Sequence, residues 1–72
     1  SGDATTGVAF LEESLAVRPG DTLAQWFLAN ALYFGTEDIE RAVPLLETVI
    51  DSGVAPEDIV AEAQRMIDEA SA

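Results

Sequence analysis

The segment DTLAQWFLANALYF, residues 21–34, decides the fold because apolar side chains surround the whole helix that it predicts. Its apolar positions are Leu23, Trp26, Phe27, Leu28, Ala29, Ala31, Leu32, Tyr33 and Phe34. A helix that is apolar on all sides has to be covered by neighbours on several sides. We therefore expect the helix at 22–34 to be the middle helix of a small helical stack.

Three further helices are predicted around it, at about 5–17, 37–51 and 56–70, from apolar residues that recur at helical spacing. Asp21 is suited to cap the helix that follows it. Gly53 is a candidate for the left-handed position that ends the third helix, and Pro56 suits the first position of the fourth. The sequence thus predicts an all-α fold, an antiparallel helix-turn-helix stack of four helices.

The third predicted helix contains a proline, Pro44, in the middle of its apolar pattern. Proline lacks an N–H and clashes with the carbonyl four residues earlier, so the helix either starts late or bends. The unbroken apolar spacing favours a bend. Glu37 and Arg41, four residues apart, are expected to form a favourable pair on this helix.

The composition excludes several classes of function. Seventy-two residues form one domain at most, and the chain has neither cysteine nor histidine. The common catalytic triads and dyads are therefore impossible. Eight of the fourteen acidic residues fall in four adjacent pairs, whose members do not share a helix face, and no stretch has calcium-loop spacing. We expect no enzyme activity, no catalytic residue, no metal site and no cofactor.

The charge of the chain limits its partners. Fourteen acidic residues face three arginines, which gives a net charge of −11. Nucleic acids and anionic membrane surfaces would be repelled, whereas a basic or neutral protein is compatible with this charge. No apolar run is long enough to cross a membrane and no signal peptide is recognisable, which favours a cytoplasmic location.

The sequence repeats itself at an offset of 35 residues. Val8, Leu11 and Glu12 recur as Val43, Leu46 and Glu47. A two-helix unit of this length leaves an apolar face that a neighbouring unit covers, as in helical solenoids. An ordinary four-helix antiparallel bundle with coincidental similarity is the alternative.

At these residues the chain resembles the tetratricopeptide repeat (TPR) family. Segment 7–21, GVAFLEESLAVRPGD, looks like the second helix of such a repeat and its exit, and Leu28, Ala29 and Leu32 fit the first helix of the next. AQWFLANALYFG, residues 24–35, is also similar to the Sel1-like branch. Two features depart from the family pattern: Gln25 stands where an aromatic residue is usual, and the exit proline of the third helix is missing.

The resemblance implies one helical domain over residues 1–72, with a whole repeat at 22–53 and half repeats at 5–19 and 56–70. It also implies a protein–protein interaction scaffold, because the family binds peptides on the face formed by its first helices. On this chain that face would carry the candidate partner-binding residues Leu23, Trp26, Asn30, Tyr33 and Phe34. Asn30 matches an asparagine that some members use to clamp a peptide carboxylate. The clamp also needs basic residues nearby, and with no lysine in the chain it is not expected here.

Two alternatives concern the apolar surfaces. Trp26 and Tyr33 are either groove residues or simply core, and core is the simpler reading in a chain this small. The face of the first helix that carries Val8, Leu11 and Leu15 is expected to lack a cover within the chain. It would then mate with missing repeats or with a second copy, which makes a structural or self-association module the alternative function.

Overall fold

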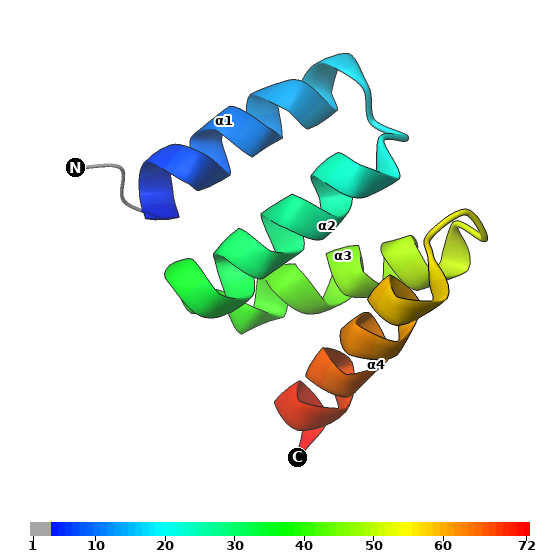
Figure 1. The fold of residues 1–72 in the computed structure, drawn as a ribbon. Helices are drawn as coiled ribbons and strands as arrows, with labels where there is room; N and C mark the ends of the chain where they lie inside the picture. Colours follow the sequence, from blue (N-terminus) through cyan, green and yellow to red (C-terminus); the bar gives the residue numbers. More distant parts are fainter. Residues whose placement is uncertain (1–3) are drawn as a thin grey trace.

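The computed structural model describes residues 4–72, and this part of the chain is helical with no β-strand (Figure 1). The elements are α1 (Ala4–Val17), α2 (Thr22–Asn30), its continuation η1 (Ala31–Gly35), α3 (Ile39–Asp51) and α4 (Glu57–Ser71). Each lies within two residues of a predicted helix. The predicted all-α stack of four helices is confirmed.

The helices pack in chain order (Figure 1). α1 and α2 lie side by side and run in opposite directions, and α2 also packs against α3. α3 in turn packs against α4. The segment at 21–34 is therefore the middle element, flanked by α1 on one side and α3 on the other, as its composition predicted.

The core consists of two clusters that share the α2–α3 pair. The first contains Val8, Leu28, Leu32 and Ala42, and the second contains Ala29, Leu46, Ala63 and Met66. Tyr33 and Leu45 pack against both clusters and so join them. Because burial of apolar surface is the main favourable term in folding, this continuous core makes the stack one unit.

The expectation of an uncovered face on α1 is wrong. Val8 is buried in the first cluster, and Leu11 and Leu15 pack against the same cluster. The face points toward α2 and η1, whose side chains Leu28 and Leu32 cover it. A dimer through Val8, Leu11 and Leu15 would therefore require this core to open.

The expectation that α2 is covered on several sides holds for only part of its circumference. Ala24, Leu28, Ala29 and Leu32 are buried. Gln25 is buried as well, and its side-chain N–H donates to the carbonyl of Pro19 at 2.8 Å, which satisfies a polar group inside the stack. The remaining apolar residues of the helix form the surface described below.

The ends of α2 follow from local chemistry. Asp21 caps it as predicted, since Oδ1 accepts the N–H of Ala24 at 3.1 Å. At the other end the helix widens into one π-turn, in which the N–H of Thr36 donates to the carbonyl of Ala31 at 3.0 Å. The N–H of Asp38 then donates to the carbonyl of Leu32 at 2.7 Å, which ties the start of α3 to the end of η1.

The predicted pair between Glu37 and Arg41 at the start of α3 is wrong. Glu37 has a left-handed backbone, with φ of 57°, so it lies outside the helix, which begins at Ile39. Arg41 therefore does not pair with Glu37. It pairs with Asp38 at 3.8 Å and with Glu12 of α1.

The prolines and glycines at the other helix ends lie close to the predicted positions. α3 runs through Pro44 as one α-helix, so the proline does not end it; the bend stays a prediction. Gly53 has a φ of 74° and follows α3 as expected. Pro56 directly precedes the first helical residue of α4, Glu57, instead of occupying that position itself.

Candidate partner-binding surface

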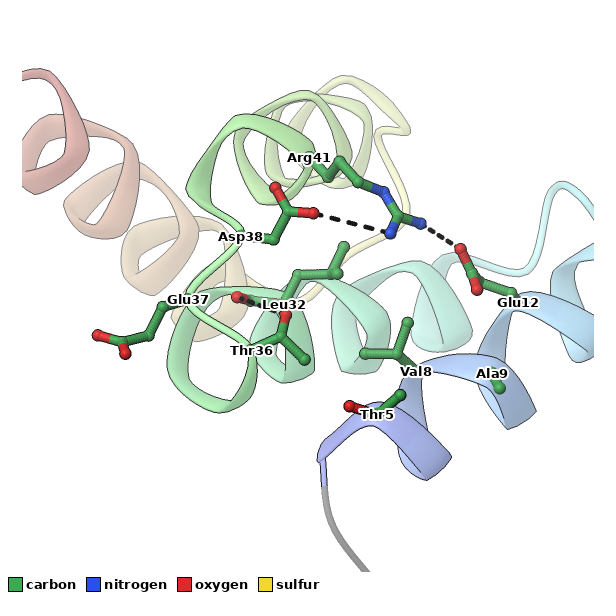
Figure 2. Close-up of a pocket in the computed structure, with 9 residues that line it drawn as sticks. All are labelled: Thr5, Val8, Ala9, Glu12, Leu32, Thr36, Glu37, Asp38 and Arg41. Atoms are coloured by element: carbon green, nitrogen blue, oxygen red, sulfur yellow. Dashed lines mark hydrogen bonds and ion pairs between the residues drawn. The ribbon is translucent and has the colours of Figure 1, made fainter.

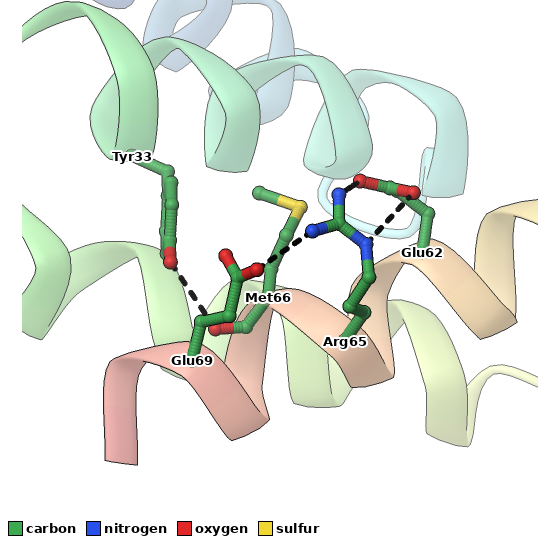
Figure 3. A network of polar contacts seen from close by, with 5 residues as sticks. All are labelled: Tyr33, Glu62, Arg65, Met66 and Glu69. Carbon is green, nitrogen blue, oxygen red and sulfur yellow. Dashed lines mark hydrogen bonds and ion pairs between the residues drawn. The ribbon is translucent and has the colours of Figure 1, made fainter. Parts of the chain in front are cut away.

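Arg41 and Arg65 form the ion pairs of the described residues, all of them at the surface. On α4, Arg65 pairs with Glu62 and with Glu69, the latter at 2.8 Å (Figure 3). The hydrogen bond and charge of Glu62, followed by the charge of Glu69, raise the pKa of Arg65 above its ordinary value. Among residues 4–72 no group of acidic, histidine or cysteine side chains is arranged to hold a metal ion.

One hollow lies between the first turns of α1, the end of η1 and the start of α3, with a volume of about 560 Å³. Figure 2 shows its lining, across which Arg41 reaches from α3 toward Glu12. Glu37 and Asp38 stand at the same edge. The one guanidinium group is thus engaged by carboxylates of the chain itself, so we assign the arrangement to joining α1 and α3.

The exposed apolar residues of the central helix form a stripe. Leu23, Phe27 and Phe34 expose 54%, 50% and 62% of their surface. Leu23 and Phe27 are four residues apart, so they fall on nearly the same side of α2, and Phe34 lies on the π-turn η1 that continues the helix. We call these three exposed residues the α2 stripe, Leu23–Phe27–Phe34, which extends from α2 onto η1. A large apolar surface on the central helix of so small a stack is typical of an interaction site.

Two of the predicted site residues, Trp26 and Tyr33, lie on the side of α2 that packs on the second core cluster. The hydroxyl of Tyr33 donates to the carbonyl of Met66 on α4 at 3.4 Å (Figure 3). Both side chains are only partly buried. Both therefore pack on the core and keep part of their surface exposed, and Trp26 also lines the second hollow described below.

The other three predicted residues lie on or beside the stripe. Leu23 and Phe34 are its two ends, and the ring of Phe34 meets the ring of Tyr33 edge to face, with centroids 4.8 Å apart. Asn30 lies between them in the sequence. Its side-chain N–H donates to the carbonyl of Trp26 at 2.8 Å, so this part of the amide already serves the helix.

A second hollow opens beside Leu23, with a volume of about 390 Å³. It lies where the start of α2 meets the connection between α3 and α4. The residues that line it are Gly20, Asp21, Thr22, Leu23, Trp26, Val54, Ala55, Pro56 and Ile59. Leu23 belongs to both this hollow and the α2 stripe, so the two form one continuous surface.

The sequence reasoning missed Phe27 and the connection at 54–56. Phe27 falls four residues after Leu23 and seven before Phe34, so helical spacing carried a signal that could have included it. Val54 and Pro56 gave no such signal, because only the packing of α4 on α3 brings their loop beside α2. Phe10 and Val17 of α1 are also exposed, which the helical spacing did not distinguish from the buried face.

Within the described residues no helix combines the length and apolar character needed to cross a membrane. No protein-family model, curated protein or solved structure matches this chain.

Proposed function

We propose that the chain is a protein–protein interaction module of the TPR type, with no catalytic activity, and that it binds a peptide or protein partner along α2. The observation that carries the proposal is the exposed α2 stripe, Leu23–Phe27–Phe34. Each of these side chains is already about half buried, so a partner that covers the rest could add roughly half of the 1.5–3 kcal/mol gained when such a side chain is buried fully. Binding can recover part of this free energy.

The order of helices supports this assignment. In the proposed scheme α1 is the second helix of one repeat, α2 and α3 form a whole repeat, and α4 is the first helix of the next. The 35-residue offset between the sequences of α1 and α3 agrees with this scheme. First helices carry the binding face in the family that the sequence resembles, and α2 is a first helix here.

Self-association is the second candidate, and the same stripe is the surface that would serve it. Its apolar area favours association of two copies, but each copy carries a net charge of −11. Repulsion between like-charged molecules opposes a homodimer at low salt. We therefore rank a different protein ahead of a second copy as the occupant of the stripe.

Site-specific photo-crosslinking in the native cells tests the proposal. Benzoylphenylalanine replaces Phe27 in the stripe, and in a control replaces Glu47, which is exposed on α3. We expect a discrete crosslinked partner from position 27 that the Phe34→Ala variant weakens, and none from position 47. Equal yields at both positions would contradict the proposal, and a crosslinked dimer of the chain would favour self-association.

A further inference from the structure

The hollow at the start of α2 combines apolar walls with one carboxylate. Leu23, Trp26 and Pro56 supply apolar surface, and Asp21 lies at the same opening. Resting on the function proposed above, we infer that the partner is basic and that this hollow takes one of its arginine or lysine side chains. The partner's apolar residues would lie on the adjoining α2 stripe.

The chemistry of the hollow fits both parts of such a side chain. Arginine and lysine carry an apolar stem that packs on hydrophobic surface while the charged end stays at the rim. The ring of Trp26 attracts a cation placed over its face. Asp21 uses Oδ1 to cap α2, and no described residue donates to its second carboxylate oxygen, which is left to accept from a guanidinium or ammonium group.

The charges around the hollow decide whether it attracts a cation or an anion. The N-termini of α2 and α4 both meet there, and each helix end is equivalent to about +0.5 charge. Against these stands the carboxylate of Asp21, which is the one charged side chain among the residues that line the hollow. The Asp21 carboxylate thus offsets the two helix ends, and the net charge of −11 on the chain favours a cation over an anion at the hollow.

A second copy of this chain offers one unengaged arginine and repels the first copy by its charge. Arg41 and Arg65 are both engaged with carboxylates of their own molecule, and the chain has no lysine. Among residues 4–72, Arg18 is the one arginine that forms no ion pair. The net charge of −11 also attracts a positively charged partner over a distance and repels another copy.

A pair of synthetic peptides tests the inference. Each is an amphipathic helix of about 16 residues with a leucine stripe. One carries arginines beside the stripe, and the other carries citrulline, which has nearly the same shape and no charge. Trp26 is the only tryptophan of the chain and lines the hollow, so its fluorescence reports binding. The protein variant is Asp21→Asn, which keeps a good helix cap and removes the charge; Glu47→Gln is the control.

The arginine peptide should bind about tenfold more tightly than the citrulline peptide, and the difference should shrink as salt is added. Asp21→Asn should reduce the difference to below about twofold, whereas Glu47→Gln should leave it unchanged. Equal affinities, or tighter binding of a third peptide with glutamates in place of the arginines, would overturn the inference.

The variant Phe27→Ala separates this inference from the proposed function. Suppose that Phe27→Ala weakens the binding of both peptides, and that the arginine and citrulline peptides bind with equal affinity. The α2 stripe is then an interaction site and the hollow does not bind a cation. If no peptide binds, the inference fails, and the crosslinking at Phe27 decides independently whether the chain has a partner.

Discussion

Leu46 and Val54 show how little the apolar character of a residue says about its contribution to stability. Both are aliphatic, and they lie eight positions apart in the sequence. Leu46 is fully buried in the second core cluster, whereas Val54 exposes 74% of its surface in the connection between α3 and α4. The free energy gained on folding depends on the area removed from water, so the two side chains differ severalfold in effect.

Leu46→Ala should lower the free energy of unfolding by about 2–5 kcal/mol, because it removes buried methyl groups and leaves a cavity. Val54→Ala should change it by less than about 0.5 kcal/mol, since little of that side chain is buried. Urea unfolding followed by circular dichroism measures both. Equal effects of the two substitutions would contradict the placement of Leu46 in the core.

Gly53→Ala should lower the free energy of unfolding by about 1–2 kcal/mol. Its φ of 74° is costly for a residue with a side chain, although no neighbouring atom lies within 4 Å of the added carbon. Gly20→Ala is the matched control, because that site is equally open and its φ lies outside the positive region. The same unfolding measurement should show no loss for Gly20→Ala, and a similar loss for both would point to a general effect of removing glycine.

At the scale of the element, α3 lacks one backbone hydrogen bond and still packs as a helix. Pro44 lies in the second turn, so the carbonyl of Glu40 lacks the N–H that normally bonds to it four residues later. The helix nevertheless contributes Ala42, Leu46 and Val49 to the buried set. Pro44 itself is exposed, which leaves room for another residue at that position.

Pro44→Ala should raise the free energy of unfolding by roughly 1–2 kcal/mol. The substitution restores one backbone hydrogen bond and removes the clash of the ring, and part of that gain is offset by a more flexible unfolded chain. Glu47→Ala, at an exposed position one turn later, is the control and should be nearly neutral. A destabilised Pro44→Ala variant would show that the proline shapes the packing of α3.

At the scale of the whole molecule, electrostatic repulsion opposes the compact state. The chain carries a net charge of −11 within a radius of gyration of 11.6 Å. The ion pairs of Arg41 and Arg65 are exposed to solvent, so each contributes little to the free energy of folding. Repulsion among the uncompensated acids is therefore the dominant long-range charge effect.

The melting temperature should rise when sodium chloride increases from about 0.02 M to about 0.5 M, because screening shortens the range of the repulsion. Thermal unfolding followed by circular dichroism measures the shift. A variant with Glu47→Gln and Asp51→Asn, which removes two exposed charges, should show a smaller shift. A melting temperature that falls with salt would mean that the ion pairs outweigh the repulsion.

The sequence by itself determined the four helices, the cap at Asp21 and the left-handed turn at Gly53. These features depend on neighbours within a few residues of the chain, through helical periodicity and through backbone groups at helix ends. The TPR resemblance and the partner stay predictions.

Only the tertiary structure decided which side of α2 faces water and which residues Arg41 meets. A helix that is apolar all round carries no local preference for the side that is covered. That choice depends on where α1, α3 and α4 pack, and these helices place Trp26 and Tyr33 against the core while Phe27 remains exposed. The candidate site was therefore only partly predictable, because spacing along one helix cannot reveal the neighbours that pack against it.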